Sequence, residues 1–263
     1  MQRVAEGIGK GVARGAEEVG FAGALFLEAV LWAVLGPARR QPVRLAAVVA
    51  QMMQIGVEAL PIATVLAATI GMMLAIQSLY SLGLFGAESF ATVGIALSVV
   101  REFAPLIVGI LVAGRSGSAL AARFSTMMIN QEVDALRVIG VSPVRFLVAP
   151  ALFAMMIVVP CLTMWANIVA LGAAGLFVTA ELDISLAAYA ADVVASLSVN
   201  DLAHGLGKSV LFAALVALVS AVNGALADGG AEGVGRRTTR AVVQSIAAII
   251  VVDMIFAFVV TAG

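Results

Sequence analysis

Charged residues are scarce in this sequence. Only 12% of its 263 residues are Asp, Glu, Lys or Arg, whereas 62% are hydrophobic, and the mean hydropathy is +1.11. A soluble domain usually has about a quarter of its residues charged. The deficit excludes an ordinary soluble domain and, together with long apolar runs, predicts an all-α protein that crosses a membrane several times.

Cysteine and histidine are each present once, as Cys161 and His204. A single cysteine excludes a disulfide within the chain, and we interpret Cys161 as a packing residue in an apolar run. A single histidine excludes a histidine-based metal site and a Ser–His–Asp triad. We therefore expect no metal ligand, no catalytic residue and no enzymatic activity in this chain.

A complete phosphate-binding loop is also missing. The stretch GLGKS at 205–209 resembles the end of such a loop, but the full pattern requires a glycine where Leu202 stands. No strand is expected before it. We therefore expect that Lys208 does not bind a nucleotide.

Long apolar runs, in contrast, are plentiful. A helix needs about 20 mainly apolar residues to cross a bilayer. The third of the runs that meet this length could tilt or continue beyond the membrane. The predicted transmembrane helices are 57–80, 91–114, 147–178, 206–226 and 241–261.

Residues 1–45 are predicted to form an interfacial elbow helix. Their apolar part, 21–35, is short and contains Glu28. Because basic residues stay on the cytoplasmic side, a crossing at 21–35 would put one of its two flanking basic clusters outside. The alternative, in which 21–35 is a sixth span, stays open. The flanking basic residues are Arg3, Lys10 and Arg14 before it and Arg39, Arg40 and Arg44 after it.

The loops between the five predicted spans alternate in charge. Loops 115–145 and 227–240 are basic, whereas loops 81–90 and 179–205 contain acidic residues and no basic ones. The positive-inside rule then places the basic loops and the N-terminus in the cytoplasm and the C-terminus outside.

Residues 118–139 are predicted to form a cytoplasmic coupling helix. No glycine or proline interrupts them before Gly140 and Pro143, which are helix stop signals. A solvated helix resting on the membrane is the alternative. The length of the loop and the small residues of AGRSGSAL, which allow a close neighbour, favour a docking helix. Four polar residues share one face at spacings of seven, four and three: Arg123, Asn130, Asp134 and Arg137.

Two segments carry recognisable motifs, REFAPLIVGILVAGRSGSALAARFSTMMINQEVDALRVIGVSPVRFLVAP and GVGRRTTRAVVQSIAAIIVVDMIFAFVV. Both resemble the MlaE/YrbE family of ABC transporter permeases. The order of the spans agrees as well, so the resemblance covers nearly the whole chain. Two positions depart from the family pattern: the acid of the loop motif stands at Glu132, and Arg237 replaces the usual alanine.

The resemblance implies a homodimeric permease in the bacterial inner membrane. Its implied partners are cytoplasmic ABC ATPase subunits, which would bind ATP and magnesium, and a periplasmic MCE-domain lipid-binding protein. Phospholipid would move between the inner membrane and the MCE protein and so contribute to outer-membrane lipid asymmetry. No cofactor is expected in this chain, and no nucleic acid. The implied ATPase contacts are Arg123, Asn130, Glu132, Asp134 and Arg137.

Charged residues within the predicted spans are candidate substrate-binding residues. A charge in a span costs at least about 2.5 kcal/mol, so it normally faces protein or water. Adjacent helical residues point about 100° apart, so Arg101 and Glu102 are expected to point in different directions. Two interpretations stay open: structural pairs, Arg101–Asp253 or Glu102–Lys208, and, by resemblance, a polar lining of a lipid headgroup cavity at the dimer interface.

Leu74, Leu82 and Phe85 are the predicted acyl-chain wall of the same substrate site. They are separated by eight and then three residues, which places them on one face of a helix. For each residue alone, ordinary packing or a lipid-facing position is the alternative.

Two other classes of protein are possible for so apolar a chain. An ion-coupled secondary transporter of a hydrophobic substrate would show an inverted repeat with broken helices, and we find no convincing repeat. A membrane-embedded enzyme of lipid metabolism would need a catalytic cluster. A single histidine and a single cysteine do not favour such a cluster.

Overall fold

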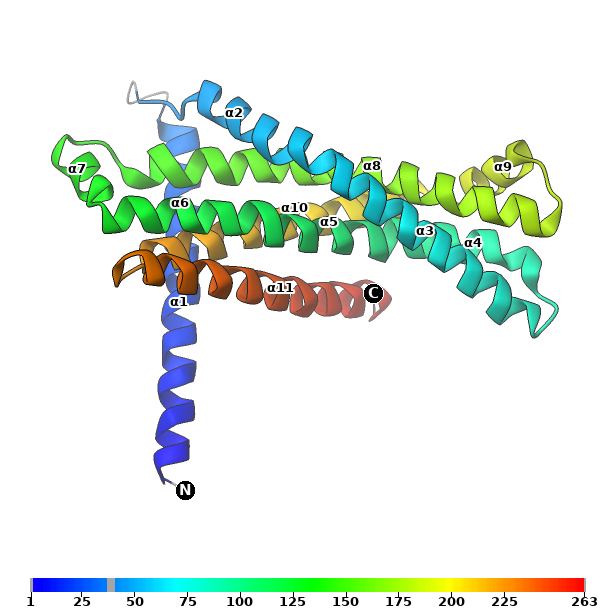
Figure 1. Cartoon of the computed structure of the whole chain (residues 1–263), viewed down its shortest axis with the longest axis horizontal. Helices are drawn as coiled ribbons and strands as arrows, with labels where there is room; N and C mark the ends of the chain where they lie inside the picture. The colour runs from blue at the N-terminus through cyan, green and yellow to red at the C-terminus, as the bar shows by residue number, and fades with distance from the viewer. Residues whose placement is uncertain (1, 37–40, 263) are drawn as a thin grey trace. The chain divides into compact units, whose positions relative to one another are not determined.

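All secondary structure in the described part of the chain is helical (Figure 1). This computed structural model describes residues 2–36 and 41–262, with the side chains of 13, 15–36 and 41–259; Arg39 and Arg40 lie outside it. The all-α class is confirmed. The longer helices are α1 (Gln2–Leu35), α2 (Leu45–Gly56), α3 (Leu60–Gly83), α4 (Ala91–Ser98), α5 (Ala104–Val112), α6 (Ser118–Ile129), α7 (Glu132–Val138), α8 (Ala149–Leu182), α9 (Leu186–Ser196), α10 (Val199–Ala225) and α11 (Gly230–Ala262). The short ones are η1 (Val57–Ala59), η2 (Glu88–Phe90), η3 (Val99–Phe103), η4 (Ala113–Gly117) and η5 (Val144–Val148).

Six described helical segments are long and apolar enough to cross a membrane. The five predicted spans overlap five of them, and the remaining one corresponds to the alternative sixth span. Length and composition do not separate a span from a helix lying in the interface, so the elbow stays a prediction. The segments are Gly15–Leu35, Leu45–Gly83, Glu88–Ile129, Val144–Leu182, Val199–Ala225 and Gly230–Val259.

The chain divides into two compact units. Helices α2, α8, α10 and α11 contribute residues to both. The prediction of a single permease domain over 1–263 is not tested by this division. The first unit contains Met1–Gln51, Ala113–Ala154 and Ala214–Ser245, and the second contains Met52–Val112, Met155–Ala213 and Ile246–Gly263.

Two π-helical turns each end shortly before a proline. η3 ends two residues before Pro105, and η5 ends two residues before Pro150. Proline has no N–H to donate, and its ring clashes with the carbonyl four residues back. A wider turn relieves this clash, and the N–H of Ala104 bonds to the carbonyl of Val99, five residues back. The turn at η3 also sets the directions of Arg101 and Glu102.

The prediction of one continuous helix over 118–139 is wrong. α6 ends at Ile129 and α7 begins at Glu132, and Gln131 between them has φ of 58°, in the left-handed region. Asn130 gives the physical reason, because a short amide side chain favours helix ends over helix interiors. Its amide donates a hydrogen bond to Glu132 Oε1 at 3.3 Å across the turn.

In the second unit, α3 and α8 meet through small residues. The buried stripe of α3 repeats every four residues and includes Ala63, Ala67, Gly71 and Ala75. A Cβ at Gly71 would overlap the carbonyl oxygen of Ala170 on α8. Glycine at this position therefore allows the two backbones to pack closely, as in many helix pairs within membranes.

The predicted acidic loop 179–205 contains α9, which is anchored on α8. Ser185 caps the N-terminus of α9 by accepting a hydrogen bond from a first-turn N–H at 3.1 Å. The Tyr189 hydroxyl donates to the carbonyl of Leu171 at 3.0 Å, and its ring covers Gly175. Burial raises the pKa of Tyr189 to about 12, because the ionised phenol would lose its hydration. The neutral, protonated side chain of Tyr189 therefore anchors α9 on α8.

In the first unit, α1 is held by polar contacts at two places. Glu18 accepts hydrogen bonds from Arg240 at 2.5 Å and from Gln244 at 3.0 Å, both on α11. Glu28 accepts a hydrogen bond from the hydroxyl of Ser142 at 2.9 Å. Figure 1 shows that α1 runs across the direction of α6 rather than along it. The two contact points on α1, Glu18 and Glu28, are ten residues apart along the helix.

Candidate functional site

Lys208 lies at the centre of an ion cluster in the second unit. Its ammonium nitrogen is 2.6 Å from Glu102 Oε2 and 3.0 Å from Asp253 Oδ1, and its side chain is only 2% exposed. The ring of Phe256 lies 5.5 Å from the same nitrogen. We call Glu102, Lys208 and Asp253 the Lys208 cluster. It joins η3, α10 and α11.

The Lys208 cluster is incomplete in two respects. Two carboxylates face one ammonium group, which leaves one negative charge in excess when both are ionised. Although Asp253 Oδ1 is close to the ammonium, it accepts no well-directed hydrogen bond from any described residue. The side chain of Glu102 is 43% exposed. The cluster is therefore accessible at Glu102 and can accept a further positive or hydrogen-bond-donating group there.

Arg101 forms a second ion pair with α10. Its Nε is 3.1 Å from Asp201 Oδ1, and its Nη2 is 3.5 Å from His204 Nδ1. Asp201 also accepts hydrogen bonds from the hydroxyl and the backbone N–H of Ser198, at 2.7 and 2.8 Å, in a capping arrangement at the start of α10. The side chain of Arg101 is 40% exposed, so part of its guanidinium stays accessible.

Arg101 and Glu102 are adjacent in the sequence, and both reach α10, at positions about two helical turns apart. Their partners, Asp201 and Lys208, are seven residues apart, which is about two helical turns and about 10 Å on one face. The wider π turn of η3 rotates less per residue than an α turn, and the long side chains span the remaining distance.

One of the two predicted pairs is present. Glu102 binds Lys208, whereas Arg101 and Asp253 do not pair among the described residues, and Asp253 binds Lys208 instead. Asp201 was not predicted as a partner of Arg101 from the sequence. A signal was available, because Asp201 and Lys208 are seven residues apart and therefore share one face of a helix.

Gly205 brings α10 against η3. A Cβ at Gly205 would overlap the carbonyl oxygen of Val100, so glycine is needed for this approach. Residues 205–209, GLGKS, lie inside α10. The stretch that resembles a phosphate-binding loop is therefore a helical packing segment.

The predicted acyl-chain wall does not lie on one helix. Leu74 and Leu82 are half-buried on α3, but α3 ends at Gly83 and Phe85 lies in the turn beyond it, 83% exposed. Gly86, with φ of 64°, lies in the left-handed region and continues this turn. The one-face prediction is wrong for Phe85, whereas the role of the three residues stays a prediction.

The predicted ATPase-contacting residues lie in the first unit. Arg123 is on α6, Asn130 and Glu132 flank the turn, and Asp134 and Arg137 form an ion pair of 3.1 Å on α7. All five are exposed. The structure brings Asp134 and Arg137 together, but the helix break separates Arg123 from them.

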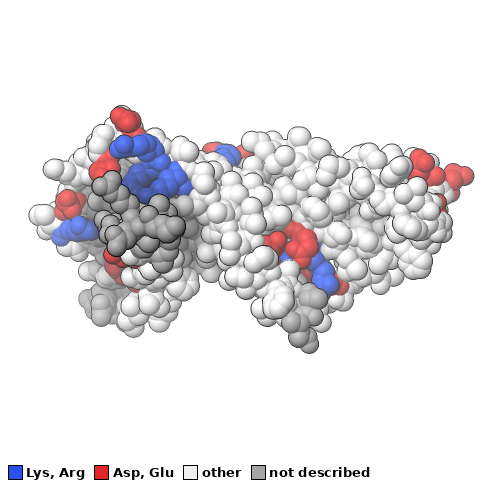
Figure 2. Space-filling view, turned by 90° about the horizontal axis from the view of Figure 1, so that it is seen from below, with Lys and Arg blue, Asp and Glu red and all other residues white. Residues whose placement is uncertain are grey.

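The charged groups of the molecule are few. On the face drawn in Figure 2, small groups of charged side chains interrupt a largely uncharged surface. Within residues 2–36 and 41–262, no group of three or more His, Cys, Asp or Glu side chains could hold a metal ion.

Several known proteins similar to this chain are named as permeases. The family model described as Permease MlaE matches residues 48–259. A "Probable ABC transporter permease protein" of Rickettsia conorii is 33% identical over 242 residues, which are 92% of each chain. Another from Synechocystis is 34% identical over 202 residues, 76% of each chain. The protein TRIGALACTOSYLDIACYLGLYCEROL 1, chloroplastic, of Arabidopsis thaliana is 32% identical over 205 residues, which are 78% of this chain and 59% of that protein.

The family match includes the residues that form the site. Glu102, Lys208 and Asp253 all fall within the matched range, as do α6 and α7. In ABC transporters of this kind the ATPase activity lies in a separate subunit. The chain therefore belongs to the MlaE permease family and is the membrane-spanning permease component of an ABC transporter.

Proposed function

We propose that this permease moves phospholipid between the bacterial inner membrane and a periplasmic MCE-domain protein. It does so as a homodimer driven by cytoplasmic ATPase subunits, and it contributes in this way to outer-membrane lipid asymmetry. The Lys208 cluster carries the proposal, because a buried ammonium with an accessible carboxylate is an unusual group in so apolar a chain. Charged groups in membrane segments are costly and commonly mark a substrate path.

The charges of the site suit a zwitterionic phospholipid headgroup. Such a headgroup carries a phosphate anion and an ammonium cation. The accessible part of Arg101 can donate hydrogen bonds to the phosphate, and the accessible carboxylate of Glu102 can accept them from the ammonium. Leu74, Leu82 and Phe85, in the same unit, are the proposed apolar wall for the acyl chains.

The name of one relative also supports a lipid substrate. The Arabidopsis relative is named after trigalactosyldiacylglycerol, a glycolipid. The sequence motifs shared with the MlaE/YrbE family support the phospholipid, the MCE partner and the homodimer as the specific form of the proposal.

The contacts of α1 support an elbow rather than a sixth span. Glu18 and Glu28 are ten residues apart, about 15 Å along the helix. They bind Arg240 and Ser142, each of which stands shortly before the apolar part of a predicted span. A crossing helix would place Glu18 and Glu28 at different depths, whereas a helix in the membrane plane places both at one depth. We therefore propose a cytoplasmic N-terminus and a periplasmic C-terminus.

The C-terminal end of α7 is the proposed contact with the ATPase subunit. Val138 and Ile139 are apolar and yet 87% and 70% exposed. The Asp134–Arg137 ion pair lies on the same short helix. Apolar side chains beside exposed polar groups are typical of the core and rim of a protein interface. Nucleotide binding in the partner would then act on the permease through α7.

Val138→Asp is expected to weaken binding of the ATPase subunit about tenfold. Covering an exposed valine contributes about 1.5 kcal/mol, and a tenfold change in Kd corresponds to about 1.4 kcal/mol. The Kd is measured with both purified subunits in detergent. Val199→Asp is the matched control, since Val199 is 82% exposed but stands at the predicted periplasmic end. Equal weakening by both substitutions would contradict a contact at α7.

Proteoliposomes that contain the permease and its ATPase subunits test the function itself. We expect ATP to accelerate transfer of a fluorescent phospholipid to a purified MCE-domain protein outside the vesicle. Equal transfer without the ATPase subunits would favour the alternative, an ion-coupled secondary transporter. ATP hydrolysis that responds to no phospholipid, with no lipid transfer, would contradict a phospholipid substrate.

A further inference from the structure

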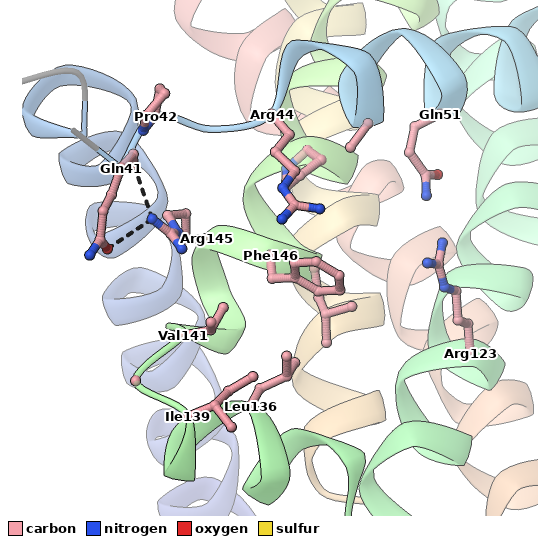
Figure 3. Close-up of a pocket in the computed structure, with 14 residues that line it drawn as sticks. Gln41, Pro42, Arg44, Gln51, Arg123, Leu136, Ile139, Val141, Arg145 and Phe146 are labelled. Atoms are coloured by element: carbon pink, nitrogen blue, oxygen red, sulfur yellow. Dashed lines mark hydrogen bonds between the residues drawn. The ribbon is translucent and has the colours of Figure 1, made fainter.

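The first unit contains a pocket with a basic lining. Its volume is about 670 Å³, and it lies between the segment that enters α2, the body of α6 and the turn that joins α7 to η5. Figure 3 shows Arg44 beside the ring of Phe146, and Arg123 directed from α6 toward Gln51 on α2. The pocket shares no residue with the Lys208 cluster.

Among the described residues, three arginines line the pocket, and no aspartate or glutamate does. Arg145 is fixed, because it donates hydrogen bonds to Gln41 at 2.8 and 3.3 Å and lies over the ring of Trp32. Arg44 lies 5.5 Å from the ring centre of Phe146. Neither Arg44 nor Arg123 has a carboxylate partner among the described side chains. The pocket therefore concentrates positive charge without internal compensation, which favours an anion.

Each of the three arginines stands near the end of an apolar segment that the predicted topology places on the cytoplasmic side. Arg44 immediately precedes the segment Leu45–Gly83, Arg145 is the second residue of Val144–Leu182, and Arg123 lies in the last turns of Glu88–Ile129. In helices that cross a membrane, segment ends lie at the depth of the lipid headgroups, and basic residues mark the cytoplasmic side. Headgroups of anionic lipids gather at basic pockets of this kind.

The rest of the lining is mostly apolar, with Gln41 and Gln51 as its polar side chains. It contains side chains that suit the glycerol and the first methylenes of a lipid better than they suit a free hydrated ion, because burying apolar surface is favourable only against an apolar partner. These side chains are Leu136, Ile139, Phe146, Leu147 and Pro150.

We propose that this pocket binds the phosphate of an anionic phospholipid from the cytoplasmic leaflet, with the guanidinium groups of Arg44 and Arg123 as its ligands. Arg145 shapes the pocket and adds charge. The lipid is not the transported molecule, because the site is built from other residues than the Lys208 cluster. Bound there, it would link α2 to the turn that follows α7 and so make the position of α7 depend on the composition of the membrane.

Short-chain lipids test the site on the purified permease in detergent. The thermal unfolding midpoint is measured against increasing dioctanoyl-phosphatidylglycerol, and an apparent Kd is taken from its saturation. We expect Arg123→Gln to raise this Kd about fivefold, since one basic residue at an anionic lipid surface contributes roughly that factor. Without lipid, the midpoint should not change, because Arg123 is exposed and forms no ion pair with the described residues that would be lost.

Two comparisons make the test specific. Arg236→Gln removes an exposed arginine of the same unit that does not line the pocket, and it should leave the Kd unchanged. Arg44→Gln is the second pocket variant and should act like Arg123→Gln. Arg123→Lys should retain most of the affinity. Equal Kd values for wild type and both pocket variants would overturn the proposal.

Inorganic phosphate and dioctanoyl-phosphatidylcholine distinguish the source of the anion. Phosphatidylcholine carries no net charge and is expected to bind without sensitivity to Arg123. If inorganic phosphate stabilises the protein as strongly as phosphatidylglycerol at equal concentration, and with the same dependence on Arg123, the lipid assignment is overturned. If these outcomes fail, the transport proposal is unaffected, because the proteoliposome assay measures ATP-driven lipid transfer and not lipid binding in this pocket.

Discussion

Lys208→Met is expected to destabilise the permease by about 3 kcal/mol and to stop lipid transfer. Methionine preserves the length and the apolar stem of the side chain, so the main change is the loss of the ammonium group. Removing one partner of a buried ion pair costs about 3–5 kcal/mol, because the remaining charge is left uncompensated. The lower end applies here, since Asp253 is 17% exposed and Glu102 43% exposed, and solvent screens part of the remaining charge.

The reason for the lost transfer can be separated from the lost stability. In the triple variant Glu102→Gln, Lys208→Met and Asp253→Asn, no charge remains in the cluster, so the unfolding midpoint should return most of the way to that of the wild type. Transfer should stay lost if the charges bind the headgroup. A triple variant that transfers lipid at the wild-type rate would mean that the cluster serves only packing.

A surface carboxylate provides the control for this series. Asp192 is exposed on α9 and lies outside the cluster, so Asp192→Asn should change neither the midpoint nor the transfer rate. Asp253→Asn alone should lower transfer while costing less stability than Lys208→Met, because the ion pair between Lys208 and Glu102 remains.

The sequence predicts the helices well, because hydropathy is a local property. Each predicted span depends only on its own run of about 20 residues, and the structure places a helix over each of them. The charged residues of the candidate site could also be identified from the sequence, since charged residues are rare within such apolar runs.

Partner choice was less predictable, because it depends on how helices are placed beside one another. Arg101 pairs with Asp201 rather than Asp253 because a π turn at η3 and a glycine contact at Gly205 fix the register of α10 against η3. Neither feature follows from apolar periodicity. Pro105 was the one local clue to the irregular turn.

Helix ends were the other source of error. The turn at Asn130 and Gln131 contains no glycine or proline, so the stop signals at Gly140 and Pro143 suggested a helix that was too long. Phe85 was assigned to a helical face although Gly83 and Gly86 stand on either side of it. In both places polar residues or glycines end the helix, although the pattern of apolar residues predicted that it would continue.

Gly205→Ala is expected to destabilise the permease by about 1–3 kcal/mol, the usual range for overpacking. The added Cβ would overlap the carbonyl oxygen of Val100, which belongs to the backbone of η3 and cannot rotate away. The two helical segments must therefore move apart. Asp201 and Lys208 stand on either side of Gly205 along α10, so the same movement would lengthen the ion pairs with Arg101 and Glu102.

Gly207→Ala is the matched control, since it introduces the same side chain two residues further along the same helix. A Cβ at Gly207 would meet no atom within 4 Å, so only the helix propensity of alanine changes, which stabilises a helix interior by up to about 1 kcal/mol. The unfolding midpoint should therefore fall for Gly205→Ala and stay or rise for Gly207→Ala, and lipid transfer should fall only for Gly205→Ala. If the two variants behave alike, the close approach of α10 to η3 does not exist in the membrane, and the Lys208 cluster would need another geometry.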